Sequence, residues 1–267
     1  MRKETRRVYW KDTMIEKISE RGFLYIAFGD AFTKEALMSI KSLKRHNKEP
    51  VALFTDQEKT DEIDSVVDVY AKIQPSHIRA KVDFVGSSPF KNTIYLDSDT
   101  LIVRNISDMF DVLERFDVAV TNDYARKRTK YSKIVPEYAE IPYAFSEVNG
   151  GVMAYNDSLA TQTFLAMWRE YFYKYFKETN GWDQVSLRVS LWRSNVRIHH
   201  FPCEYNIRSH ANREKQDRFK HEFGEQHMAP RIYHMHYSPE VHQNKFKFTQ
   251  EELDEFEECV IKQAVWY

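Results

Sequence analysis

Short apolar runs that each end near an acidic residue restrict what this chain can fold into more than any other feature. Residues 23–28 and 50–56 are two such runs, and each has the length of a buried strand. The stretch between them carries an apolar stripe at helical spacing that includes Leu37, Ile40 and Leu43. A strand, a helix and a second strand in this order predict an α/β fold in which right-handed crossovers join parallel strands.

The alternation of strands and helices continues through the first half of the chain. We expect one domain over 1–267, with an N-terminal extension at 1–20 and a C-terminal helix at 249–267. The expected architecture is a mostly parallel central sheet flanked by helices. Further strands are expected at 66–70, 93–96, 117–121, 148–155, 197–201 and 231–237, and further helices at 76–86, 106–116, 158–178 and 183–193.

Charge and composition exclude several classes of protein. Lys and Arg total 39 against 40 Asp and Glu, and the net charge of −1 argues against non-specific binding of nucleic acid. No apolar stretch approaches the roughly 18 residues of a membrane span, and we recognise no secretory signal peptide. Two cysteines are too few for a disulfide framework. We therefore expect a cytoplasmic protein with no integral membrane segment.

Five acidic residues stand directly after predicted strands. The carboxyl ends of parallel strands meet at one edge of a sheet, and ligands of open α/β sheets bind there. Acidic side chains gathered at that edge favour a metal ion or a ligand rich in hydroxyl groups. The five residues are Asp30, Asp56, Asp97, Asp99 and Asp123.

Asp97-Ser98-Asp99 is the D-x-D motif of the chain, and it follows a predicted strand. Two carboxylates separated by one residue can converge on a hard cation. Mg²⁺ or Mn²⁺ typically takes one or two protein carboxylates and fills its shell with phosphate oxygens and water. The spacing alone also describes a β-turn with solvated aspartates. The apolar runs 94–96 and 101–103 on either side are what favour the metal hypothesis.

His234 and His236 alternate within a predicted strand, so both side chains would point to one face. A neutral imidazole can complete a Mn²⁺ site. The alternative is that one histidine lies in the core and the other on the surface.

Two polar segments in the second half of the chain are further candidates. Asn149-Gly150-Gly151 precedes an apolar run, which indicates either close approach of a ligand to the backbone or a turn. Asp183-Gln184 opens a predicted helix, where Asp183 could equally be the N-cap. Lys81 lies in the helix expected at 76–86, where lysines usually form a solvated face.

Taken in order, these segments resemble the glycogenin and galactosyltransferase type of GT-A glycosyltransferase, which is glycosyltransferase family 8 in the broad sense. Residues 26–37 resemble the nucleotide-binding opening of that family, and Tyr95-Leu-Asp-Ser-Asp-Thr100 with Ile106-x-Asp108-x-Phe110 resembles its D-x-D signature. The resemblance spans residues 23–237. Its later matches are Asn149-Gly-Gly-Val152, Asp183-Gln184, Phe201-Pro-x-x-Tyr-Asn206 and Ile232-Tyr-His234.

The resemblance implies a GT-A, Rossmann-like fold and a hexosyltransferase activity. A nucleotide-diphospho-sugar, with a UDP-hexose as the expected donor, would give its sugar to a hydroxyl acceptor with retention at the anomeric carbon. Asp97, Asp99 and His234 would hold Mn²⁺ or Mg²⁺, with His236 as a second candidate ligand. Asp183, Gln184 and Asn149 would lie at the reacting sugar. The residues implied in binding the donor or its metal are Ala27, Phe28, Gly29, Asp30, Phe32, Lys81, Asp97, Ser98, Asp99, Gly150, Gly151 and Lys245.

The chain departs from the family pattern at several positions. Phe32 stands where the family often has a tyrosine near the nucleobase, and Gly150 replaces a frequent serine. The family's H-x-x-G-x-x-K-P-W ending is missing after His234. Its absence leaves Lys245 as the candidate for the phosphate-contacting lysine and leaves open whether His234 or His236 binds the metal.

Two other readings of the motifs stay open. Leu96-Asp-Ser-Asp-Thr100 also fits the D-x-D-x-T motif of haloacid dehalogenase-type phosphohydrolases, which would use Asp97 and Asp99 directly. The chain could also be a non-catalytic protein that binds a sugar nucleotide. If it is a transferase, the acceptor is a glycan, a protein or a small molecule, and the polar segment 124–145 would be a lid or an acceptor loop.

Overall fold

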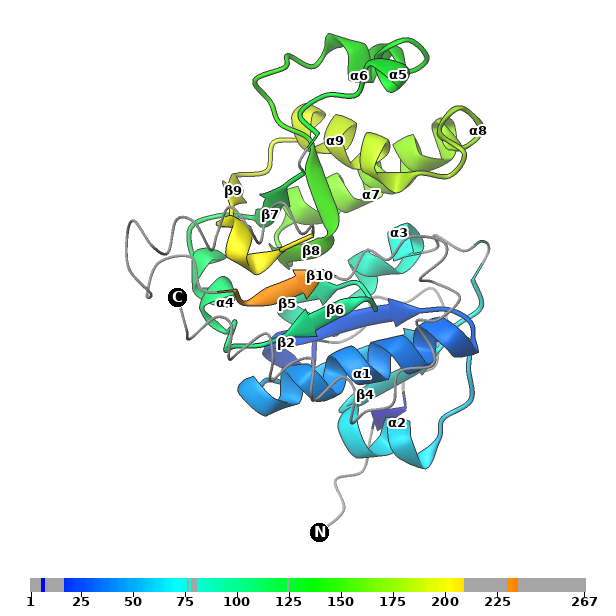
Figure 1. Cartoon of the computed structure of the whole chain (residues 1–267), viewed down its shortest axis with the longest axis vertical. Coiled ribbons are helices and arrows are strands. Elements are labelled where there is room, and N and C mark those ends of the chain that lie inside the picture. Colours follow the sequence, from blue (N-terminus) through cyan, green and yellow to red (C-terminus); the bar gives the residue numbers. More distant parts are fainter. Residues whose placement is uncertain are drawn as a thin grey trace.

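An eight-stranded mixed sheet runs through the centre of the structure, a computed structural model that describes residues 6–7, 17–75, 77, 81–123, 125–208 and 230–234 (Figure 1). The strand order is β1-β4-β3-β2-β5-β8-β7-β9. All neighbouring pairs are parallel except those of β8, which runs antiparallel to both β5 and β7. The expected mostly parallel sheet is thereby confirmed. The strands are β1 Arg6–Arg7, β2 Ser19–Ala27, β3 Val51–Thr55, β4 Val69–Lys72, β5 Phe90–Leu96, β7 Val118–Asn122, β8 Val148–Asn156 and β9 Ile198–His200.

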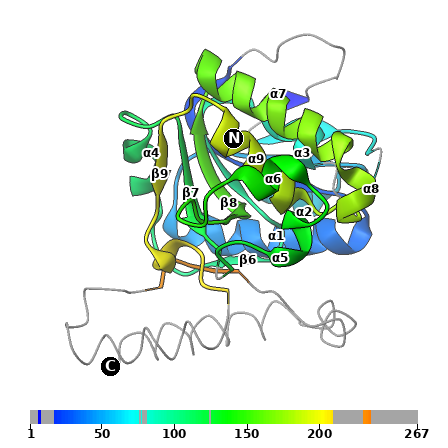
Figure 2. The same cartoon turned by 90° about the horizontal axis from the view of Figure 1, so that it is seen from above.

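Helices cover both faces of the sheet. Seen from above, α1 and α7 lie on opposite sides of the strands (Figure 2). The short helices α5 and α6 lie beyond the sheet, at the top of Figure 1. The helices of the described residues are α1 Asp30–His46, α2 Asp61–Val66, α3 Lys81–Phe84, α4 Asp108–Val112, α5 Thr129–Ser132, α6 Pro136–Glu140, α7 Leu159–Lys174, α8 Phe176–Thr179 and α9 Asp183–Arg193, with 3₁₀ turns η1 Val85–Ser87 and η2 Cys203–Tyr205.

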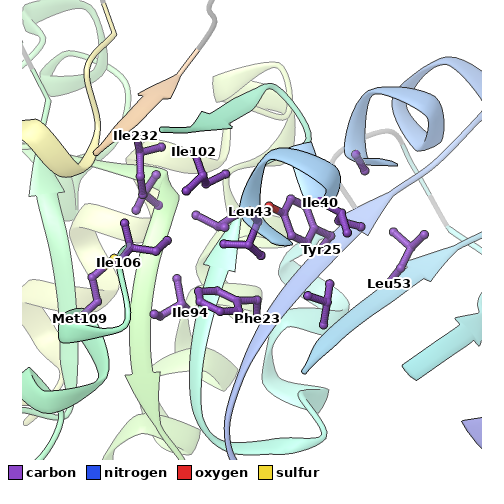
Figure 3. Close-up of a cluster of buried hydrophobic side chains, with 14 of the residues drawn as sticks. Phe23, Tyr25, Ile40, Leu43, Leu53, Ile94, Ile102, Ile106, Met109 and Ile232 are labelled. Atoms are coloured by element: carbon purple, nitrogen blue, oxygen red, sulfur yellow. The ribbon is translucent and has the colours of Figure 1, made fainter. Parts of the chain in front are cut away.

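The alternation of side chains along β2 divides the core into two halves. Phe23 and Tyr25 point toward α1 and pack with Ile40, as Figure 3 shows, whereas Leu24 on the same strand belongs to the opposite half. The opposite half is filled by aromatic residues of α7 such as Trp168. Because both faces of β2 and β5 are buried, these strands read as continuous apolar runs in the sequence.

A separate two-stranded sheet brings the end of the described chain to the centre. Strand β6 Thr100–Ile102 follows the D-x-D motif, and β10 Ile232–His234 pairs with it antiparallel. Ile232 lies opposite Ile102, and both pack against the half of the core that α1 covers (Figure 3). The register places His234 opposite Thr100, one residue from Asp99.

Several expected boundaries differ from the observed ones. Helix α2 was not expected; it begins after Thr60, whose side chain accepts the Ile63 N–H, and it buries one apolar side chain, Ile63. The helix expected at 158–178 is two helices, because the chain leaves helical conformation at Tyr175 between α7 and α8. The segment 124–145 contains α5 and α6, and the helix expected at 249–267 lies outside the described residues. Among the helices that are described, none has both the length and the hydrophobicity to cross a membrane.

Candidate functional site

The D-x-D motif stands at the carboxyl end of β5, beside the antiparallel strand β8. The Asp97 N–H donates to Gly151 O at 2.8 Å, which carries the strand pairing one residue beyond β5. Tyr95, two residues before Asp97, donates its hydroxyl to Asp97 Oδ1 at 2.5 Å. The backbone and a neighbouring strand residue therefore hold the Asp97 carboxylate in place.

Asp97, Asp99 and His234 form a group that could hold a metal ion. One ligand atom from each residue lies within 4.8 Å of those of the other two. His234 Nε2 is 3.1 Å from Asp99 Oδ1 and 3.8 Å from Asp97 Oδ2. Two carboxylates and an imidazole are a donor set that suits Mn²⁺, and carboxylates with phosphate oxygens suit Mg²⁺. Among the described residues, this is the one such group of three or more ligand residues.

Gly151 leaves the space in which this group meets. A Cβ atom on Gly151 would lie 2.2 Å from His234 Cε1 and 2.6 Å from Asp97 Oδ2, both far inside van der Waals contact. Any other residue at this position would therefore displace two of the three candidate ligands. The preceding residue, Gly150, is also closely packed, with a Cβ position 3.0 Å from the Leu187 side chain.

Lys81 joins the D-x-D motif to the start of α9. Its Nζ lies 3.0 Å from Asp97 Oδ1 and 3.2 Å from Asp183 Oδ2, and it donates to Gly150 O at 3.5 Å. Burial opposes the charge on Lys81, but the two carboxylates outweigh that effect and raise the pKa of the ammonium group. The lysine is thus a fixed positive charge inside the site, whereas the sequence also allowed a place on a solvated face.

Asp183 and Gln184 begin α9, and both side chains are buried. Gln184 Nε2 donates to Asp123 Oδ2 at 2.7 Å. Asp123 stands directly after β7 and also accepts from Arg208 and from the Ala125 N–H. The carboxylate of Asp123 therefore fixes which end of the Gln184 amide faces it, and the carbonyl oxygen Oε1 is turned elsewhere.

A buried charged cluster ties the segment 124–145 to α9. Glu147 accepts from the Tyr138 hydroxyl at 2.9 Å, and Arg128 Nε lies 3.8 Å from it. Burial raises the pKa of Glu147 to about 7, because it outweighs the hydrogen bond from Tyr138 and the charge of Arg128. On α9, the fully buried Arg188 donates to the backbone oxygens of Pro142 and Phe145. The segment is therefore folded against α9 in this structure.

The candidate donor-binding residues at the end of β2 surround a turn. Gly29 has a φ of 82°, a conformation that favours glycine, and its N–H donates to Asp56 Oδ1 at 2.8 Å. Phe28 contacts the ring of Phe84 on α3. The other members of this set lie as follows: Ala27 is buried, Asp30 pairs with Lys34 on the surface, and Phe32 packs partly against the core under α1.

The remaining candidates divide into two groups. Ser98 turns away from the metal-ligand group and donates to Glu35 on α1 at 2.8 Å, while Asn149 accepts the Gly151 N–H at 3.1 Å. His236 and Lys245 lie outside the described residues. The structure thus gathers Lys81, Asp97, Asp99, Gly150, Gly151, Asp183 and His234 in one place.

The sequence analysis missed the contacts that support these residues. Tyr95 shares a strand face with Asp97, so the two-residue period of β5 could have identified it. Asp123 was noted only as an acidic residue after a strand, and its contact with Gln184 joins positions 61 residues apart. Glu35 offers no signal in the sequence, because it is one charged residue among many on α1.

Comparison with known proteins identifies the fold. No family model matches the chain, and no curated protein matches its sequence. Solved structures do match. The galactosyltransferase LgtC, in complex with donor and acceptor sugar analogs, has 12% identity and a TM-score of 0.62, with 89% of this chain and 95% of LgtC covered.

Two further glycosyltransferase structures are similar. Mouse xyloside xylosyltransferase 1, in its apo form, has 12% identity and a TM-score of 0.55, with 82% of this chain and 98% of the mouse chain covered. The glycosyltransferase GlyE of Streptococcus pneumoniae TIGR4 has 17% identity and a TM-score of 0.53, with 91% of this chain and 64% of GlyE covered. The chain therefore has the GT-A fold of the nucleotide-diphospho-sugar transferases.

Proposed function

We propose that this protein is a metal-dependent glycosyltransferase that moves a sugar from a nucleotide-diphospho-sugar, with a UDP-hexose as the expected donor, to a hydroxyl acceptor. One observation carries the proposal. Asp97, Asp99 and His234 come from distant parts of the chain, yet their ligand atoms converge at the carboxyl end of a central strand of a GT-A fold. Ligands of open α/β sheets bind at this edge.

The three candidate ligands fit a divalent cation. Their ligand atoms lie within 4.8 Å of one another, and Gly151 leaves the space between them free of a side chain. When bound, Mn²⁺ or Mg²⁺ would neutralise the diphosphate and favour departure of the nucleoside diphosphate. Asp97 and Asp99 would supply the carboxylates, and His234 would supply a ring nitrogen.

The residues around the cation would bind and orient the donor. Lys81 would add a second positive charge beside the leaving diphosphate, already fixed between Asp97 and Asp183. The turn at Ala27–Asp30 and the ring of Phe32 would lie against the nucleoside. Asp183 and Gln184 would face the sugar, with Asp123 holding the Gln184 amide.

Retention of the anomeric configuration belongs to the proposal as well. One structural neighbour is LgtC with an active-site glutamine replaced by glutamate. In this chain Gln184 is the buried glutamine next to Asp183 at the start of α9. It is the residue we place at the face of the sugar opposite the leaving group.

Thermal unfolding with UDP, with Mn²⁺ and with both tests the site. A ligand at about 100 times its Kd adds ~2.7 kcal/mol to the free energy of unfolding, a shift of a few degrees in a protein of this size. We expect UDP to raise the Tm only when Mn²⁺ is present. The Asp99→Asn variant should lose that response, and Asp61→Asn, at an exposed position on α2, should keep it.

The outcomes also separate the alternatives. A response to UDP and Mn²⁺ together, followed by hydrolysis or transfer from a panel of UDP-sugars, supports the transferase. A response without turnover on any sugar donor supports the non-catalytic binding protein. No response to any nucleotide, together with hydrolysis of a generic phosphate ester that needs Asp97, supports the phosphohydrolase.

A further inference from the structure

A chain of buried side chains connects the backbone of Gly151 to the ring of His234. The Gly151 N–H donates to Asn149 Oδ1 at 3.1 Å, and Asn206 Nδ2 lies 2.9 Å from the same oxygen. At its other end, Asn206 Oδ1 lies 2.9 Å from His234 Nδ1. Asn149, Asn206 and His234 are each no more than 6% exposed, so water does not compete for these bonds.

The backbone end of this chain determines the direction of every hydrogen bond in it. A backbone N–H can only donate, so the Asn149 atom that faces it must be the carbonyl oxygen. That oxygen can only accept, so the Asn206 atom beside it must be Nδ2. The same Nδ2 lies 2.7 Å from Thr121 Oγ1, which takes its second hydrogen. Asn206 Oδ1 is therefore the atom that faces His234, and His234 Nδ1 must donate to it.

A proton on Nδ1 leaves Nε2 as the one ring nitrogen that can bind a cation. Nε2 is also the nitrogen that faces the two carboxylates, 3.1 Å from Asp99 Oδ1 and 3.8 Å from Asp97 Oδ2. Metal-binding histidines generally donate their other N–H to an oxygen acceptor, which sets the tautomer and the orientation of the ring. Asn206 occupies that place here.

The backbone holds Asn206 and His234 in register. The Asn206 N–H donates to Cys203 O at 3.0 Å, and the next residue, Ile207, forms a parallel bridge with Tyr233. The His234 N–H in turn donates to Ile207 O at 2.8 Å. The two side chains therefore approach each other from main-chain segments that are hydrogen-bonded together.

We propose that Asn206 is a positioning residue that sets the tautomer and the orientation of His234, so that Nε2 is presented to a divalent cation. The inference rests on the proposed function, because it concerns the same metal site. It extends that site beyond the three ligands to a fourth side chain and gives that side chain a defined task. It also gives Asn149 a task, which is to transmit the direction of the Gly151 N–H to Asn206.

The first test reads the tautomer in the metal-free protein. Long-range ¹H–¹⁵N correlations of ¹⁵N-histidine-labelled protein distinguish Nδ1–H from Nε2–H at a pH where the ring shifts are those of neutral imidazole. The His234 signals are those lost in His234→Asn. We expect Nδ1–H in the wild type and loss of this preference in Asn206→Leu. An Nε2–H ring in the wild-type protein overturns the inference, whether or not the protein binds metal.

The second test measures Mn²⁺ affinity directly, by isothermal titration and by the electron paramagnetic resonance signal of free Mn²⁺. Removing such a partner of a metal ligand typically weakens metal binding about 10- to 100-fold, and we expect this range for Asn206→Leu. The control is Asn47→Leu, which removes another buried amide, one that accepts the Ile106 N–H at 2.9 Å, and should keep wild-type affinity. Wild-type affinity in Asn206→Leu overturns the inference.

A conservative variant guards against a trivial loss of folding. Asn206→Asp keeps an oxygen opposite His234 Nδ1, so it should retain Nδ1–H and bind Mn²⁺ more tightly than Asn206→Leu. Equal loss in both variants, with both folded by circular dichroism, counts against a role in setting the tautomer. If the wild type binds no Mn²⁺, the proposed function fails, while the tautomer measurement still decides the role of Asn206.

Discussion

Lys81 Nζ lies 3.2 Å from Asp183 Oδ2, so an ion pair joins α3 to the first residue of α9. The same ammonium group reaches Asp97, which makes it the one link between the metal-ligand group and α9 among the ion pairs of the described residues. Its positive charge is held in place by two carboxylates rather than by solvent. A group fixed in this way needs no reorganisation when charge develops beside it.

Replacing Lys81 by methionine should lower kcat/KM about 100- to 1,000-fold, the range seen when one fixed electrostatic group is removed from an active site. Lys81→Arg should recover part of the loss. Steady-state kinetics with the donor identified by the nucleotide screen measures the effect. The matched control is Lys34→Met, which breaks an exposed ion pair with Asp30 on α1 and should leave kinetics unchanged. Equal rates in Lys81→Met and Lys34→Met would show that Lys81 has no electrostatic role.

Replacing Gly151 by alanine should abolish or strongly weaken Mn²⁺ binding, because its Cβ would lie 2.2 Å from His234 Cε1 and 2.6 Å from Asp97 Oδ2. Forcing atoms into such a space typically costs about 1–3 kcal/mol of stability. Gly86→Ala is the control, since the nearest atoms to its Cβ position are 3.8 Å away. Mn²⁺ titration and urea unfolding of the two variants give the comparison. Wild-type Mn²⁺ affinity in Gly151→Ala would contradict the proposed ligand set.

Glu147 should make the protein less stable at alkaline than at acidic pH. Burial raises its pKa from an ordinary value of 4.5 to about 7, so between these pH values the folded state binds more protons than the unfolded state. The free energy of unfolding should therefore fall by about 1–3 kcal/mol as the pH rises through this window.

Urea midpoints measured from pH 4.5 to 8 for wild type and Glu147→Gln test this dependence. The variant should lose this part of the pH dependence and gain stability relative to the wild type at pH 8. Glu140→Gln removes an exposed carboxylate from the same segment and should behave as the wild type does. A pH profile of Glu147→Gln that coincides with that of the wild type would refute the assignment.

Replacing Asp123 by asparagine should reduce kcat more than it changes the KM for the donor. The substituted amide would no longer fix the orientation of the Gln184 side chain, whose Nε2 donates to the fully buried Asp123 carboxylate at 2.7 Å. We expect kcat to fall about 10- to 100-fold, the size of a lost orientation effect. Kinetics and unfolding are measured together, because the change also removes the partner of Arg208.

Asp117→Asn is the matched control for Asp123. Asp117 is another buried carboxylate at β7, paired with Arg197 at 2.9 Å, and this pairing holds its pKa at about 2. The Asp117 variant should lose stability without a specific loss of kcat. Parallel losses of stability and kcat in both variants would reduce Asp123 to a purely structural residue.

The positions of the central strands could be predicted because β2, β3, β5 and β7 are buried on both faces and read as apolar runs. Helix α2 could not, since it buries only Ile63 and depends on the Thr60 cap. Asp97 and Asp99 follow from their place after a strand. The partnership of Gln184 with Asp123 depends on how α9 packs beside β7, and of His234 with Asn206 on how two distant backbone segments pair, so neither has a local signature.

The place of His234 in the chain has a consequence for biosynthesis. The last strand of the central sheet, β9, ends at His200, whereas His234 follows 34 residues later on β10. Because a polypeptide emerges from the ribosome N-terminus first, the central sheet can assemble before the third candidate ligand has been translated. A nascent chain would therefore pass through a folded stage that carries both aspartates but only an incomplete metal centre. Competence to bind the cation would be the last property that the growing protein acquires.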